Sequence, residues 1–174
     1  MRFVPNKRPI PRHWGTKPRA GGLLAEADIF VHPRGRLAAK LLVFDKPQAL
    51  RRFWVGVVGS DIGRECRGAV NALAQTREQF GVKNPDPPRM TGDPRYFCII
   101  GLCQRWLSAE VVTHEAVHAG YCYEKRVQRN LFGKVGDFDE ERIAYPTGRI
   151  AGAMNEFLRN KNLYLGPPRK SKVK

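Results

Sequence analysis

The chain has 174 residues and a formal net charge of +15, from 31 Lys and Arg against 16 Asp and Glu. Its length and its 42% of hydrophobic residues suit one domain with a single core. No apolar run approaches the length of a membrane span, which excludes a transmembrane segment.

Much of the positive charge lies at the two ends of the chain. Residues 1–20 hold six basic side chains among four prolines and no acid, and residues 166–174 are similar. We therefore expect a basic N-terminal arm over 1–22, one domain over 23–165 and a basic tail over 166–174. Such arms attract phosphates, so nucleic acid is a possible partner. The alternatives are that they aid solubility or dock onto an acidic partner.

The N-terminus carries no apolar stretch typical of a secretory signal, so we expect a cytoplasmic protein. If the chain is encoded by a bacteriophage, that means the host cytoplasm. The four cysteines agree with this expectation. They form no CxxC pair and are too sparse for the disulfide framework of a small secreted domain. The oligomeric state does not follow from the sequence.

The pattern between the arms predicts strands followed by helices. Residues 26–31 and 37–44 are predicted to form a hairpin around 32–36, and 53–58 a third strand. Residues 64–80 are predicted to be a helix, 84–94 an irregular loop and 96–102 a further strand. This order predicts an α+β fold with a mostly antiparallel sheet.

The next predicted helix carries the motif His114-Glu115-Ala116-Val117-His118, with Ser108 as its N-cap. Residues four apart share a helix face, so both imidazoles can reach one metal ion. Glu115 is placed to hold a water molecule there. This is the HExxH arrangement of zinc metallopeptidases. The alternative is two histidines on a solvated face beside a coincidental glutamate.

A catalytic zinc site needs a third protein ligand. A second predicted helix begins in an acidic stretch, where Glu140 and Glu141 are the candidates. We favour Glu141, because it begins a row of small residues, Ala144, Gly148 and Gly152, that would let the two helices approach closely. Pro146 is predicted to interrupt and kink this helix. Cys122, four residues after His118, is either a fourth ligand or packs beneath its helix.

These two motifs, HEAVH and the later stretch Glu140-Glu141-Arg142-Ile143-Ala144-Tyr145, resemble the gluzincin branch of the zincin metallopeptidases. The chain looks most like small zincin-like proteins of bacteriophages, over about residues 95–158. The resemblance implies a zincin-like fold with an HExxH helix and a following ligand helix. It also implies that His114, His118 and Glu141 bind Zn²⁺ and that Glu115 is the general base. Tyr145 stands where the family often has an aspartate.

The function that follows is zinc-dependent hydrolysis of peptide bonds in a protein or peptide substrate. In zincins the substrate commonly pairs with an exposed edge strand above the metal. The oxyanion needs a donor besides the metal, for which Tyr145, Tyr121, Tyr123 and Arg142 are candidates by sequence proximity. Two alternatives stay open. One is an SprT-like metallopeptidase that acts on proteins bound to DNA, and the other is a catalytically silent zincin fold that binds or inhibits a partner.

Overall fold

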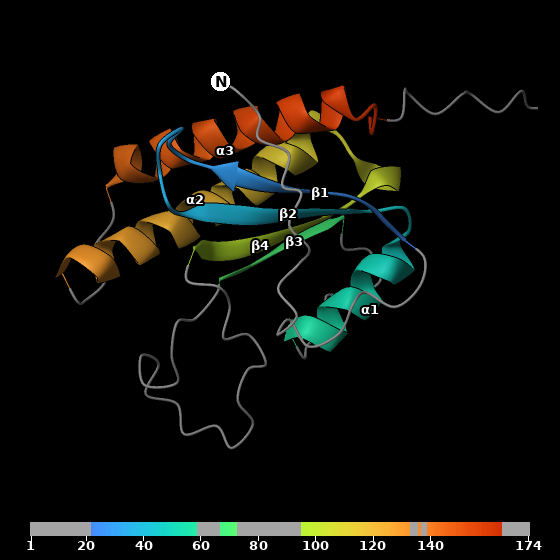
Figure 1. Ribbon diagram of the computed structural model, residues 1–174, viewed down its shortest axis with the longest axis horizontal. Coiled ribbons are helices and arrows are strands. Elements are labelled where there is room, and N and C mark those ends of the chain that lie inside the picture. Colours follow the sequence, from blue (N-terminus) through green and yellow to red (C-terminus); the bar gives the residue numbers. More distant parts are fainter. Residues whose placement is uncertain (1–21, 59–66, 73–94, 133–135, 137–138, 165–174) are drawn as a thin grey trace, which may run out of the picture.

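The computed structural model describes residues 22–58, 67–72, 95–132, 136 and 139–164. These residues form an α+β fold in which a four-stranded mixed sheet is followed by two packed helices (Figure 1). The elements in order are β1 (Leu23–Phe30), β2 (Ala38–Phe44), α1 (Pro47–Val58), β3 (Gly68–Ala72), β4 (Tyr96–Cys103), a 3₁₀ turn (Gln104–Trp106), α2 (Ala109–Phe132) and α3 (Glu140–Asn160). The predicted arms lie outside the described residues, apart from residue 22.

The strands lie in the order β1-β2-β4-β3. β1 and β2 form the predicted antiparallel hairpin, β3 pairs antiparallel with β4, and β2 and β4 are parallel. Every residue of the two middle strands is buried, as expected for strands covered on both faces. The predicted strand at 96–102 is confirmed, and β3 lies at one edge of the sheet that these strands form.

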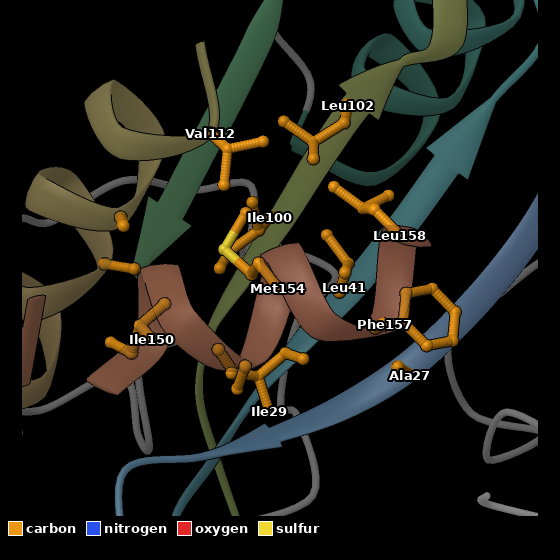
Figure 2. Close-up of a cluster of buried hydrophobic side chains, with 14 of the residues drawn as sticks. Ala27, Ile29, Leu41, Ile100, Leu102, Val112, Ile150, Met154, Phe157 and Leu158 are labelled. Atoms are coloured by element: carbon orange, nitrogen blue, oxygen red, sulfur yellow. The ribbon is translucent and has the colours of Figure 1, made fainter. Parts of the chain in front are cut away.

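Helices cover both faces of this sheet. α2 and α3 pack on one face, and α1 lies on the other (Figure 1). Figure 2 shows how α3 fills the larger core: Ile150, Met154, Phe157 and Leu158 point from α3 toward the strands. They recur at helical spacing, so a single face of α3 is buried. In the described part of the chain, no helix is long and apolar enough to cross a membrane.

The predicted third strand at 53–58 is wrong, because these residues belong to α1. Pro47 begins this helix, at a position where a missing N–H costs nothing. Ala49, Leu50 and Trp54 then recur at helical spacing and are buried against the sheet. The spacing of the buried side chains outweighs the β propensity of Val55, Val57 and Val58.

The predicted helix at 64–80 is also wrong where the structure describes it. Residues 68–72 form β3, and Gly68 pairs with Leu102 while Ala72 pairs with Cys98. The remaining residues of that prediction, apart from Arg67, and the predicted loop at 84–94 lie outside the described residues. A short strand that is stabilised by pairing with a distant strand leaves little local signal in the sequence.

α2 and α3 run antiparallel and approach each other closely at Gly120. A Cβ on Gly120 would collide with the side chain of Thr147 and lie 3.3 Å from the carbonyl oxygen of Ile143. Farther along, Arg142 pairs with Glu124 at 3.6 Å. The small residue that permits close packing is therefore on α2. The prediction that the row of small residues on α3 lets the helices approach closely is wrong, because a Cβ on Gly148 or Gly152 would have nothing within 4 Å.

Candidate metal centre

Both long helices begin at side-chain caps. The hydroxyl of Ser108 accepts a hydrogen bond from the backbone N–H of Val111 at 3.2 Å, as predicted for the HExxH helix. Asp139 accepts one from the N–H of Arg142 at 3.2 Å and caps α3. α3 continues through Pro146 to Asn160, so the predicted interruption is not observed. α2 continues well beyond the HExxH motif, to Phe132.

The imidazoles of His114 and His118 lie together on the exposed side of α2. Their Nε2 atoms are 3.2 Å apart, and the ring planes are inclined by 75°. Two nitrogens bound to one zinc ion at about 2.05 Å with a near-tetrahedral angle stand roughly 3.3 Å apart. The observed separation therefore fits two imidazoles that share one zinc ion. The same separation also permits a hydrogen bond between neutral rings, with one nitrogen as donor.

Glu115 lies between these two histidines in the sequence but points to a different side. Its side chain is buried, with 5% of the residue exposed. Burial raises the pKa of the Glu115 carboxyl above its ordinary value of 4.5, and the charge of His114 opposes that shift. A carboxyl group that is shielded from solvent and has a raised pKa is suited to accept and release a proton.

β3 provides the surface on which Glu115 lies. A Cβ on Gly68 would stand 2.8 Å from Cγ and Oε1 of Glu115, so this glycine is in direct contact with the carboxylate. The sequence pattern did not predict this contact, because Gly68 lies inside the segment predicted to be a helix. The glycine alone carries no signal of a neighbour 47 positions away in the chain.

The structure does not bring Glu141 to the histidines. Successive residues of an α-helix are rotated by about 100° around the helix axis. Gly120 therefore faces a direction roughly 160° from that of His118 and 120° from that of His114. α3 packs against Gly120, so it covers the flank of α2 that is turned away from both imidazoles. Arg142 pairs with Glu124, which lies six residues, or about 9 Å, beyond His118 along α2. Glu141 is next to Arg142, so it also lies about 9 Å beyond His118 along α2.

Both candidate carboxylates of α3 are exposed to solvent. Glu140 and Glu141 sit in the first turn of the helix, where negative charge favours the helix dipole. Among the residues that the structure describes, no three His, Cys, Asp or Glu side chains are grouped so that they could hold a metal ion. The assignment of Glu141 as third ligand thus stays a prediction that this helix arrangement does not support.

The four candidate oxyanion donors lie in different places. Tyr145 stands beside His32, with ring centres 5.7 Å apart, and the guanidinium of Arg149 lies 5.4 Å from its ring. Tyr123 packs on the core and lies near His32 as well, at 6.4 Å. Arg142 pairs with Glu124 and Asp139. None of these three is brought to the histidine pair.

Tyr121 is the candidate on the same flank of α2 as the histidines. It follows His118 by three positions, which places the two side chains about 60° apart around the helix. It is exposed, and the ammonium of Lys125 lies 4.3 Å from its ring centre. Of the four candidates, the structure therefore places Tyr121 nearest to the flank that carries the imidazoles.

Cys122 points into the protein. Its thiol is hydrogen-bonded to that of Cys98 in the core, and this bond lowers the pKa of Cys122. Burial raises the pKa of Cys98 well above its ordinary value. These contacts favour packing beneath the helix over a role as fourth ligand.

Comparisons with protein-family models, with curated proteins and with solved structures gave no match to this chain.

Proposed function

We propose that this protein is a zinc-dependent peptidase that uses His114 and His118 as metal ligands and Glu115 as general base. The observation that supports it is the 3.2 Å separation of the two Nε2 atoms of His114 and His118. Glu115, the residue between them in the motif, has a buried carboxylate. A zinc ion bound there would act as a Lewis acid, polarising the scissile carbonyl and acidifying a water molecule. The resemblance to the zincins, stated above from the motifs, points to the same chemistry.

In this proposal the residues of the chain have separate tasks. The two imidazoles hold the metal on the exposed side of α2. Glu115 accepts a proton from the attacking water and passes it to the leaving amine. β3 is the edge strand nearest to Glu115, since Gly68 touches its side chain. A substrate peptide that added a strand to this edge would carry its backbone past the carboxylate.

The third ligand is proposed from the resemblance alone. If Glu141 is that ligand, α3 must approach the histidine flank of α2 when zinc binds. Glu141→Gln should then weaken zinc binding more than ~100-fold, beyond the usual effect of an outer-shell change. Glu140→Gln is the matched control. Equal zinc affinity in both variants and the parent would show that the third ligand lies elsewhere.

The experiment for the proposed function uses zinc-loaded protein and a mixture of unfolded polypeptides, with new N-termini identified by mass spectrometry. Glu115→Gln keeps the size of the side chain but removes its ability to take a proton. Cleavage should fall at least ~10²-fold in this variant, because a positioned general base contributes that much. Cleavage that persists in Glu115→Gln would exclude the proposed mechanism. A biological effect that persists in this variant would favour a silent binding protein.

A second candidate follows from the net charge of +15. An SprT-like peptidase would use its basic arms to reach proteins on DNA through a salt-dependent attraction. Deleting residues 1–20 should then weaken DNA binding and flatten its dependence on salt, while the circular dichroism spectrum stays unchanged. DNA binding that is unaffected by the deletion would assign the arm another role.

A further inference from the structure

The carboxylate of Glu115 has a backbone neighbour that leaves it little freedom. Gly68, the first residue of β3, is buried beneath it. A Cβ at this position would lie 2.8 Å from Cγ, 2.8 Å from Oε1 and 2.9 Å from Cδ of Glu115. All three distances are shorter than a carbon contact allows. A side chain at position 68 therefore requires either the Glu115 side chain or the backbone of β3 to shift.

We infer that Gly68 is a positioning residue, which sets where the Glu115 carboxylate lies; this inference rests on the proposed function. The backbone of β3 at Gly68 lies directly against the Glu115 side chain. A general base must lie within hydrogen-bond distance of the proton that it accepts, and an error of about 1 Å can cost ~10²-fold in rate.

A neighbouring glycine provides the matched control. Gly101 of β4 pairs with Ala69, the residue next to Gly68. A Cβ on Gly101 would also collide, at 2.6 Å from Cδ1 of Leu50 and 2.9 Å from Cζ3 of Trp54. Those side chains belong to α1, on the opposite face of the sheet. Gly101→Ala therefore introduces the same methyl group into the adjacent strand without touching Glu115.

The first measurement is the affinity of acetohydroxamate for the zinc-loaded full-length protein, determined by titration calorimetry. In the proposed mechanism this chelator would take the place of the reacting water, and Glu115 would accept its hydroxyl proton. Glu115→Gln and Gly68→Ala should each keep zinc but weaken hydroxamate binding at least ~10-fold, the effect of one charge-assisted hydrogen bond. Gly101→Ala should stay within about twofold of the parent. Equal affinities for Gly68→Ala and Gly101→Ala would overturn the inference.

The second measurement does not depend on zinc. In the presence of a chelator, Gly68→Ala should lower the Tm of the parent protein by several degrees. In a Glu115→Ala background the colliding atoms are absent, so the same substitution should cause less than half that decrease. Equal decreases in both backgrounds would overturn the inference, whatever the metal does. A parent protein that binds no zinc would instead overturn the proposed function.

Discussion

Thr147 of α3 lies directly against Gly120 of α2, and this contact determines which flank of α2 stays open. Because α3 packs there, His114 and His118 face solvent on the other side of the helix. The position of the two imidazoles is therefore a consequence of helix packing as well as of the HExxH spacing.

The contact at Gly120 should be important for stability. Gly120→Ala would force its Cβ into Thr147, and we expect a loss of about 1–3 kcal/mol of unfolding free energy, typical of an overpacked core. Gly148→Ala is the control, since a Cβ there meets nothing within 4 Å. It should gain about 0.5–1 kcal/mol, because alanine is the better helix former. Urea unfolding measures both. Similar values for the two variants would contradict the described packing of α2 and α3.

A buried ion pair stabilises the hairpin on the other face of the sheet. The side chain of Lys40 is 2% exposed and lies 3.1 Å from Asp28, which also accepts a hydrogen bond from the hydroxyl of Tyr96 at 3.0 Å. Lys40→Met would remove the buried ammonium that pairs with Asp28 at 3.1 Å and with Glu26 at 3.6 Å, and we expect a loss of about 3 kcal/mol. The exposed Lys46→Met should change stability by less than about 0.5 kcal/mol. A loss below about 1 kcal/mol for Lys40→Met would show that the pair is dispensable.

The raised pKa of Glu115 predicts a pH dependence of stability in the zinc-free protein. The folded state holds the proton more tightly than the unfolded state, whose carboxyl titrates near 4.5. The stabilising contribution is complete below pH 4.5 and is lost as the pH rises through the folded pKa. Glu115→Gln should therefore be more stable than the parent at pH 7, and this advantage should shrink toward pH 4. Unfolding in a chelator at several pH values measures it, with the exposed Glu110→Gln as control. An advantage that grows as the pH falls would contradict the described burial.

The sequence predicted the hairpin, β4 and the HExxH helix, because short apolar runs and the Ser108 cap are local signals. It failed at α1, where valines typical of strands belong to a helix with a buried Leu50–Trp54 face. It also failed at β3, which depends on pairing with β4. Both errors come from tertiary contacts that override local propensity.

For the candidate site, the HExxH spacing alone predicts two imidazoles as metal ligands and Glu115 as general base, and these roles stay predictions. The choice of Glu141 depended on the row of small residues packing against α2. The row instead faces open space, and Gly120 supplies the close approach. A row of small residues does not reveal which of two helices carries the contact. Gly68 could not be found, because its contact with Glu115 joins segments that are far apart in the chain.

The central claim is that His114 and His118 share one zinc ion, and metal analysis of the purified full-length protein tests it most directly. The account predicts one zinc per chain in the parent and in Glu115→Gln, and none in His114→Ala or His118→Ala. His32→Ala removes an exposed histidine beside Tyr145 and should keep its zinc. A parent protein without zinc, or zinc retained when either motif histidine is replaced, would contradict the account.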